Sequence, residues 1–225
     1  MAMFKRFFQT LKFKAMARQL RKPGGTVGNK VGLMMNKANE FLYDCTINTM
    51  QLTCNDKLLE IGFGNGKFFD KLFAAAPGLH VTGLDFSHTM INAAKENNQL
   101  SINEGRLMIA QGSSDQMPFA DNSFDKIFCI NVIYFWDEPH LHLQEIGRVL
   151  KPGGRFFATI RTKESMELMP FTKYGFTKYN ENEWNELVEQ NQFSFEKAVQ
   201  INEPEVEFEG KPFRVWSLCL VAEKK

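Results

Sequence analysis

From residue 57 to residue 160, short apolar runs alternate with stretches of helical character, and this alternation constrains the fold more than any other feature. The runs predict strands at 57–61, 80–85, 105–112, 124–131 and 154–160, with helices at 67–75, 87–100 and 141–150. Strands that alternate with helices form a parallel sheet with helices on both faces. Ligands of such sheets bind beyond the carboxyl ends of the strands, where the strand order reverses. We therefore expect a binding site in the loops that follow these strands.

A glycine-rich stretch follows the first predicted strand, in the pattern Glu60-x-Gly62-x-Gly64-x-Gly66. Glycine has no Cβ, so the backbone turns sharply at these positions and a ligand approaches it closely. A dinucleotide fold requires G-x-G-x-x-G, and Lys67 occupies the position of the third glycine. The stretch does not match the phosphate-loop pattern G-x-x-x-x-G-K-[ST] either. The sequence therefore disfavours a dinucleotide as the ligand.

The stretch 60–66 instead resembles motif I of the class I S-adenosylmethionine-dependent methyltransferases. Three further stretches resemble this family in the same order: "GLDFSHTMI" (83–91), "QGSSDQMPFADNSFDKIFCINVIYFWDEP" (111–139) and "EIGRVLKPGG" (145–154). The resemblance implies an α/β fold with a Rossmann-like, doubly wound, seven-stranded sheet that is mostly parallel, with an antiparallel C-terminal strand and helices on both faces. It also implies S-adenosyl-L-methionine as the cofactor.

By the same resemblance, the cofactor contacts residues in the loops after the first four predicted strands. These residues are Glu60, Gly62, Phe63, Gly64, Gly66, Asp85, Phe86, Met90, Ser113, Ser114 and Asn131. Asp85 is a two-oxygen acceptor suited to the ribose hydroxyls, and Phe86 offers a flat face to adenine. Asp85 can instead be a helix N-terminal acid, and Asn131 a polar strand cap.

Two positions depart from the family pattern. Family members commonly carry an acid directly after the glycine of the third loop, where it meets the adenine amine, whereas this chain has Ser113. The enzymes of this class that methylate amino groups of nucleic acids carry two prolines where Val132 and Ile133 stand. A base flipped out of a nucleic acid is therefore disfavoured as the methyl acceptor.

Methyl transfer from a sulfonium is an in-line displacement that depends on alignment and exclusion of water, so no catalytic base is required. Catalytic residues are left unassigned, with Tyr134 and His140 as the candidates. Tyr134 is expected to form an aromatic wall near the sulfonium or the acceptor. His140 and His142 stand two positions apart on a predicted helix and point in different directions, so no metal site is predicted. We expect both histidines at the surface.

Residues 1–39 carry nine basic residues and no acid. Within them an apolar set follows the spacing of an amphipathic helix: Phe4, Phe7, Phe8, Leu11 and Ala15. Residues 1–22 would then contact an anionic membrane surface, dock on their own domain, or serve as an organellar transit peptide. The sequence leaves these three interpretations open.

A second helix is predicted at 31–50, after the helix-breaking stretch 21–28. Its expected buried positions are Leu33, Met34, Phe41, Leu42 and Ile47. We expect residues 1–55 to form an N-terminal helical cap or arm, and residues 56–225 to form the methyltransferase domain.

The segment 161–225 is where we expect the methyl acceptor to be chosen. Its aromatic and methionine-rich part, at about 161–195, predicts either a lid over an apolar acceptor or ordinary packing, with a short helix at 183–190. Two strands at 199–208 and 214–224, joined by a turn that contains Gly210, are expected to complete the sheet.

The stretch "MPFADNSFD" makes the methyltransferases of ubiquinone and menaquinone biosynthesis the most similar subfamily. We expect a methyltransferase that acts on a small, lipophilic acceptor. The alternatives are an S-adenosylmethionine-binding sensor or partner protein without turnover, and an RNA-modifying methyltransferase suggested by the basic N-terminus. Because no apolar run is long enough to span a bilayer and the four cysteines form no C-x-x-C pair, we expect a cytoplasmic protein with peripheral membrane contact at most.

Overall fold

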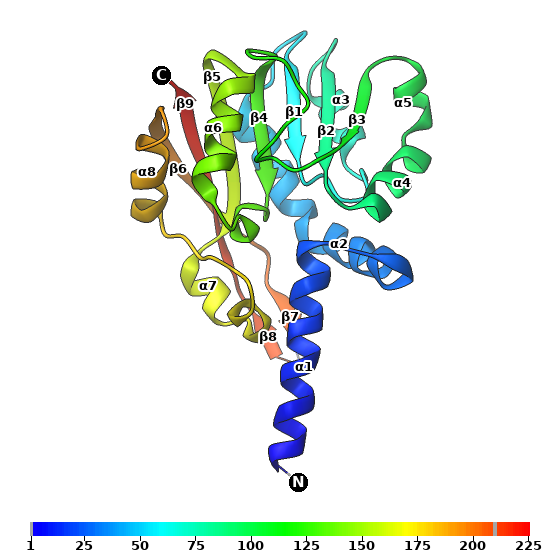
Figure 1. Cartoon of the computed structure of the whole chain (residues 1–225), viewed down its shortest axis with the longest axis vertical. Coiled ribbons are helices and arrows are strands. Elements are labelled where there is room, and N and C mark those ends of the chain that lie inside the picture. The colour runs from blue at the N-terminus through cyan, green and yellow to red at the C-terminus, as the bar shows by residue number, and fades with distance from the viewer. Residues whose placement is uncertain (1, 209–210) are drawn as a thin grey trace.

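The computed structural model describes residues 2–208 and 211–225. In that part of the chain seven strands form one sheet, in the order β3-β2-β1-β4-β5-β9-β6 (Figure 1). Its strands are β1 (Lys57–Ile61), β2 (His80–Asp85), β3 (Leu107–Gln111), β4 (Phe124–Ile130), β5 (Leu150–Arg161), β6 (Phe193–Asn202) and β9 (Trp216–Lys224). The strands from β3 to β5 pair in parallel, whereas β9 is antiparallel to both β5 and β6. The predicted fold class is confirmed.

Helices cover both faces of this sheet (Figure 1). They are α1 (Ala2–Arg21), α2 (Gly25–Met50), α3 (Phe69–Ala75), α4 (His88–Asn97), α5 (Gln99–Asn103), α6 (Pro139–Val149), α7 (Lys163–Glu167) and α8 (Glu181–Glu189), with the 3-10 turns η1 (Ile133–Phe135) and η2 (Pro170–Lys173). Successive residues of a strand point to opposite faces, so in β4 Ile127 packs in the core beneath α6 and α8, and Phe128 in the core beneath α2, α3 and α4. Each face therefore has its own hydrophobic core.

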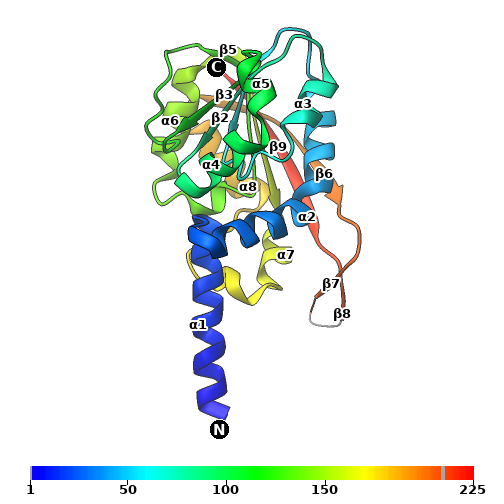
Figure 2. The same ribbon diagram turned by 90° about the vertical axis from the view of Figure 1, so that its right-hand side faces the viewer.

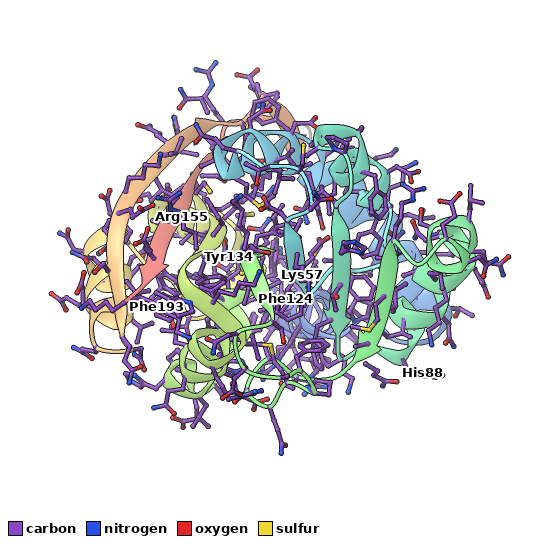
Figure 3. All side chains as sticks on the ribbon, turned by 90° about the horizontal axis from the view of Figure 1, so that it is seen from above. Lys57, His88, Phe124, Tyr134, Arg155 and Phe193 are labelled. Atoms are coloured by element: carbon purple, nitrogen blue, oxygen red, sulfur yellow. The ribbon has the colours of Figure 1, made fainter. Side chains whose placement is uncertain are left out.

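The strand order reverses between β1 and β4, which are neighbours in the sheet although β2 and β3 lie between them in sequence. Figure 3 looks onto the edge where these two strands begin, at Lys57 and Phe124. Their carboxyl ends lie at the opposite edge, which is the place where open α/β sheets bind ligands.

The predicted helix at 87–100 is divided in the structure, because α4 ends at Asn97 and α5 begins at Gln99. The side-chain amide of Asn98 donates to the backbone oxygens of Gly66 and Ala94, at 3.1 and 2.9 Å. A side chain that bonds to nearby backbone groups competes with the helical hydrogen bonds, so the helix stops there.

The predicted helix at 31–50 begins earlier, at Gly25, and three of its expected buried positions are wrong. Leu33, Met34 and Phe41 are exposed by 63%, 43% and 39%, whereas Leu42 is buried and Ile47 half-buried. The first half of α2 extends beyond the sheet, as Figure 2 shows, so Leu33 and Met34 do not reach the core.

The predicted strand at 199–208 is divided in two, whereas the predicted strand at 214–224 corresponds to one strand, β9. β6 already begins at Phe193 and ends at Asn202, and the hairpin of β7 (Val206–Phe208) and β8 (Lys211–Phe213) stands apart from the sheet. Pro204 follows β6 and has no N–H for a ladder hydrogen bond, so it interrupts the run. The predicted turn at Gly210 lies outside the described residues.

α1 extends away from the sheet in both ribbon views (Figure 1 and Figure 2). It contacts α2 and η2, and Ala17 in its second half is buried. Phe7, Phe8 and Leu11 in the first half are exposed by 60%, 62% and 47%. Among the described residues, none of the helices has the length and apolar character needed to cross a membrane.

Candidate functional site

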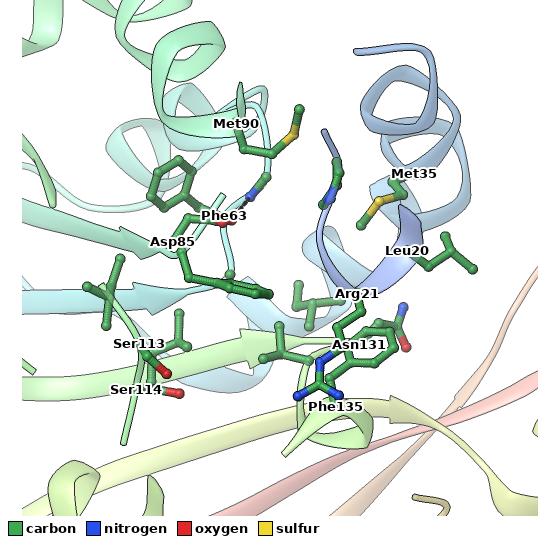
Figure 4. Close-up of a pocket in the computed structure, with 18 of the residues that line it drawn as sticks. Leu20, Arg21, Met35, Phe63, Asp85, Met90, Ser113, Ser114, Asn131 and Phe135 are labelled. Carbon is green, nitrogen blue, oxygen red and sulfur yellow. Dashed lines mark hydrogen bonds between the residues drawn. The ribbon is translucent and has the colours of Figure 1, made fainter. Parts of the chain in front are cut away.

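A cavity of about 220 Å³ lies at the carboxyl ends of β1, β2 and β4. Figure 4 shows Asp85 and Met90 on one side of it, and Leu20, Arg21 and Met35 on the other. We call it the first cavity. It lies where the strand order reverses, as the sequence predicted for the ligand site.

The glycine turn after β1 forms part of its wall. Gly62, Gly64 and Gly66 all have positive φ, at 73°, 61° and 68°, which only glycine adopts readily. A Cβ on Gly64 would meet nothing within 4 Å, because it would point into the first cavity. A Cβ on Gly66 would approach Ala94 to 2.9 Å, so this glycine serves packing against α4 instead.

Asp85 joins the glycine turn to the start of α4. Its Oδ2 accepts a hydrogen bond from the N–H of Gly64 at 3.1 Å, and its Oδ1 accepts one from the N–H of Ser87 at 2.8 Å. Burial raises the pKa of Asp85 to about 6, against the lowering effect of these hydrogen bonds and of Lys22. At neutral pH the cavity therefore contains a buried carboxylate with lone pairs left for further donors.

Glu60 lies behind the first cavity and does not line it. The hydroxyl of Tyr43 in α2 donates a hydrogen bond to Oε1 of Glu60, and Tyr43, not Glu60, lines the first cavity. Burial raises the pKa of Glu60 to about 8, so the acid is mostly protonated at neutral pH. The pair ties α2 to the strand that leads into the glycine turn.

One end of the first cavity lies at the loop after β3 and is lined by Ser113, Ser114 and His142. His142 is 8% exposed, so the expectation that it lies at the surface is wrong. Its ring stacks on Trp136 with the centroids 4.6 Å apart, and its Nδ1 lies 2.8 Å from Oγ of Ser114. Burial lowers the pKa of His142, so the ring is neutral at neutral pH.

The opposite end of the first cavity is built around Asn131, which follows β4 with a φ of 58°. Its amide donates to Oδ1 of Asn39 at 3.0 Å, and its Oδ1 accepts from the hydroxyl of Tyr134 at 2.9 Å. The Tyr134 hydroxyl also accepts a hydrogen bond from the N–H of Arg161. These bonds fix the orientation of the Asn131 side chain.

The N-terminal helices complete the first cavity. Arg21 pairs with Asp137, with Nη1 of the arginine 3.1 Å from Oδ1 of the acid. Nζ of Lys22 lies 5.1 Å from the centroid of the Phe86 ring, within the range of a cation–π contact. α1 and α2 are thus held against the loops after β2 and β4.

A second cavity, of about 400 Å³, lies on the other side of Asn131. Its lining is largely apolar and comes from α1, α2 and the segment after β5, with Met34, Phe41, Met166, Met169, Phe171 and Phe176 among its members. Five residues line both cavities: Leu20, Met35, Asn39, Asn131 and Phe135. The two cavities therefore adjoin at Asn131 and Phe135.

Most of the residues expected at the cofactor site line the first cavity: Gly62, Phe63, Gly64, Asp85, Phe86, Met90, Ser113, Ser114 and Asn131. Glu60 and Gly66 lie directly behind it. Of the two catalytic candidates, Tyr134 lines the second cavity. His140 lines neither cavity; its Nδ1 lies 2.9 Å from the side-chain amide of Asn191.

The residues that we did not anticipate come mainly from α2. Its cavity-lining members Gly32, Met35, Asn36, Asn39 and Tyr43 recur every three or four positions. They form one helical stripe, but Gly32, Asn36 and Asn39 in it are small or polar, so a search for apolar periodicity passes over it. His142 was detectable, because it stands four and seven positions before the buried Ile146 and Val149 on α6.

Residues 59–158 match the family model of the methyltransferase domain. The uncharacterised methyltransferase YdaC of Bacillus subtilis is 28% identical over 134 residues, which are 60% of this chain and 72% of that protein. The ubiquinone/menaquinone biosynthesis C-methyltransferase UbiE of Geotalea daltonii is 34% identical over 102 residues, which are 45% of this chain and 43% of that enzyme. The match therefore spans less than half the length of the UbiE enzyme.

A solved structure with a similar fold is that of a methyltransferase in complex with the Haloferax volcanii activator Trm112. Its TM-score is 0.75 at 18% identity, over 92% of this chain and 96% of that chain, a likeness of fold alone. The family match rests on the strands and loops that form the first cavity, and the fold agrees over nearly the whole chain. The chain therefore contains a class I S-adenosylmethionine-dependent methyltransferase domain, with S-adenosylmethionine as its cofactor.

Proposed function

We propose that this protein transfers a methyl group from S-adenosylmethionine in the first cavity to a small apolar acceptor in the second. The observation that carries the proposal is that the two cavities adjoin at Asn131 and Phe135. Methyl transfer needs the acceptor in line with the methyl group and water kept away from both, and two adjoining pockets meet that need.

The first cavity offers matching groups for each part of the cofactor. The carboxylate of Asp85 accepts hydrogen bonds from the ribose hydroxyls, and the bare backbone of Gly64 admits the sugar and the amino acid chain. Ser113, Ser114 and His142 surround the adenine, in place of the acid that is common in the family. Asn131 then lies at the methyl end, beside the opening to the second cavity.

The second cavity sets the character of the acceptor. Its volume of about 400 Å³ suits a small molecule, and its lining is dominated by methionine and aromatic side chains. Met166, Met169 and Phe171 belong to the segment expected as a lid, so we propose that residues of about 161–195 cover the acceptor. Residues 1–55 act as a cap, because α1 and α2 line both cavities.

Catalysis in this arrangement comes from alignment. The cofactor supplies an electrophilic methyl group, and the chain's own residues hold the two reactants and exclude water. Burial raises the pKa of Tyr134 well above its ordinary value, and its hydroxyl is already engaged with Asn131 and Arg161. We therefore assign Tyr134 the role of positioning Asn131, and no general base.

The proposal is tested by incubating the purified protein with S-adenosylmethionine labelled in its methyl group and an organic-solvent extract of cells. We expect label in the organic phase and an equal amount of S-adenosylhomocysteine. Binding of S-adenosylmethionine with no transfer to organic, RNA or protein fractions would instead support the sensor or partner protein. Label in RNA would support the RNA-modifying alternative.

We also propose that the first half of α1 rests on an anionic membrane surface. Phe7 and Phe8 are exposed by 60% and 62%, on a helix segment that projects from the domain (Figure 1). Residues 1–39 contain nine basic residues and no acid, which complements anionic lipid headgroups. Since Met16 and Leu20 of the same helix line the second cavity, an apolar acceptor dissolved in the bilayer would enter near the membrane.

A further inference from the structure

An ion pair forms part of the wall of the otherwise largely apolar second cavity. Arg161 is the last residue of β5, and Glu203 follows β6. Nη2 of Arg161 lies 3.0 Å from Oε2 of Glu203, and the two side chains are exposed by only 16% and 6%. Taking two charges out of water costs free energy that their mutual attraction only partly offsets, so a pair in this position calls for an explanation.

Neighbouring elements hold both members of the pair in place. Glu203 accepts a second hydrogen bond from Arg161 Nε at 3.1 Å and one from the hydroxyl of Ser217 in β9 at 2.6 Å. Arg161 Nη2 donates to the backbone oxygen of Ala38 in α2 at 2.9 Å. The guanidinium is therefore fixed next to Asn39, the residue that accepts the hydrogen bond of Asn131 at the junction of the cavities.

The arginine has donors to spare. A guanidinium carries five N–H groups, of which Nε and Nη2 provide three, and those are engaged with Glu203 and Ala38. Nη1 provides the other two and has no hydrogen-bond partner among the described residues. Within that part of the chain, the only fully buried side-chain nitrogen or oxygen without a partner is Nε1 of Trp184, so Nη1 is accessible. It is thus available to a molecule in the second cavity.

We propose that the methyl acceptor is an apolar molecule with a hydroxyl or carbonyl oxygen, and that Arg161 Nη1 donates a hydrogen bond to that oxygen. This inference rests on the proposed function and names the class of substrate for the same site. A pure hydrocarbon would contact the apolar lining of the second cavity but leave the two N–H donors of Nη1 unpaired, which costs binding free energy. Phenols, enols and ketones with short apolar substituents can contact the apolar lining and also accept a hydrogen bond from Nη1 of Arg161.

Calorimetric titration of the full-length protein, saturated with S-adenosylhomocysteine, tests this with 4-propylphenol and propylbenzene as probes. We expect the phenol to bind about tenfold more tightly, the factor for one hydrogen bond to a charged donor. The double variant Arg161→Met/Glu203→Met removes the pair without leaving a lone buried charge, so it should fold. In it the preference for the phenol should disappear while propylbenzene still binds.

A matched control pair joins β5 and β6 themselves. Nη2 of Arg155 in β5 lies 3.0 Å from Oε1 of Glu196 in β6, and neither residue lines a cavity. Arg155 is labelled in Figure 3, near the sheet edge at which β1 and β4 begin. Arg155→Met/Glu196→Met should keep the tenfold preference for the phenol.

A preference for the phenol that persists in Arg161→Met/Glu203→Met would overturn the inference and leave the pair a purely structural link between β5, β6 and α2. Failure of both probes to bind the wild-type protein would overturn it as well. In either case, binding of S-adenosylhomocysteine and transfer of label to an organic extract would leave the proposed function standing. If the wild-type protein does not bind S-adenosylhomocysteine, the proposed function itself is contradicted.

Discussion

The hydroxyl of Tyr134 donates a hydrogen bond to Oδ1 of Asn131 at 2.9 Å, at the junction of the two cavities. Asn131 in turn donates to Asn39 at 3.0 Å, so residues of α2, the loop after β4 and η1 form one connected set. Since Asn131 lines both cavities, its orientation affects the cofactor and the acceptor at once.

Tyr134→Phe removes the donor to Asn131 and the acceptor for the N–H of Arg161. Leaving such groups unpaired in a buried site costs about 1–3 kcal/mol of folding stability. Because Asn131 then loses the hydrogen bond that orients it between the two reactants, we expect kcat to fall by about tenfold. Affinity for S-adenosylhomocysteine should fall less than kcat, because Asp85 and Ser113 of the first cavity keep their positions and Tyr134 does not line that cavity. Tyr179→Phe is the control, since Tyr179 is buried in the same core and its hydroxyl has no hydrogen bond among the described residues. Equal kcat values for the two variants would contradict the role of Tyr134 in positioning Asn131.

Gly64→Val should abolish binding of S-adenosylmethionine while leaving a folded protein, because the new side chain points into the first cavity. The residue has a φ of +61°, so a side chain there also strains the backbone, by about 1–2 kcal/mol. Gly105→Val carries the same kind of strain, at a φ of +70° with open space around it, and lies outside both cavities. Calorimetry should find wild-type affinity in Gly105→Val. Intact binding in Gly64→Val would place the cofactor elsewhere.

Binding of S-adenosylhomocysteine should weaken as the pH falls from 7 to 5. Burial raises the pKa of Asp85 to about 6, so its carboxylate, the acceptor for the ribose hydroxyls, becomes protonated across this window. If only the ionised form binds well, the dissociation constant rises by about tenfold at pH 5. The pKa of Glu60 is about 8, so Glu60 stays protonated throughout and does not contribute.

The sign for stability is the reverse of the sign for binding. The folded-state pKa of Asp85 is above its ordinary 3.8, so its contribution to folding stability is present below pH 3.8 and is lost as the pH rises through 6.

For the binding prediction, Asp85→Asn is the control, because it cannot titrate. It should show weak affinity for S-adenosylhomocysteine that does not change between pH 5 and 7. A wild-type affinity that is equally flat would show that Asp85 does not hold the ribose.

Phe7→Gln/Phe8→Gln should reduce binding to phosphatidylserine vesicles, because these side chains are exposed on the projecting half of α1. Each basic residue near the surface adds about 1 kcal/mol of attraction that salt screens, so wild-type binding should also fall at high ionic strength. Leu100→Gln/Met108→Gln is the control, since these residues are exposed by 69% and 52% on α5 and β3. Sedimentation with vesicles decides the matter. Equal binding by both double variants, or none by the wild-type protein, would contradict membrane contact through α1.

The sheet and the first cavity were predictable because their signals are local. The glycine pattern at 60–66 and Asp85 directly follow strands, and parallel strands bring their carboxyl ends to one edge. The contribution of the N-terminal helices was not predictable in this way. Asn39 meets Asn131 and Tyr43 meets Glu60, at separations of 92 and 17 residues, through polar contacts that no apolar periodicity marks.

The strand prediction for the segment after β6 was wrong for a similar reason. Residues 199–208 look like one strand, but Pro204 interrupts the ladder, and Glu203 turns to Arg161, 42 residues before it in the sequence. Strand propensity describes the fit to a half-buried sheet, and it carries no information about an ion pair formed across β9. The second cavity and its charged wall therefore became visible only in three dimensions.

A crystal structure of the protein with S-adenosylhomocysteine tests the central claim most directly. The account predicts the ribose hydroxyls at the carboxylate of Asp85, the adenine beside Ser113, Ser114 and His142, and the sulfur facing Asn131 and the second cavity. Ligand bound outside the first cavity, or a sulfur that faces away from the second cavity, would contradict it.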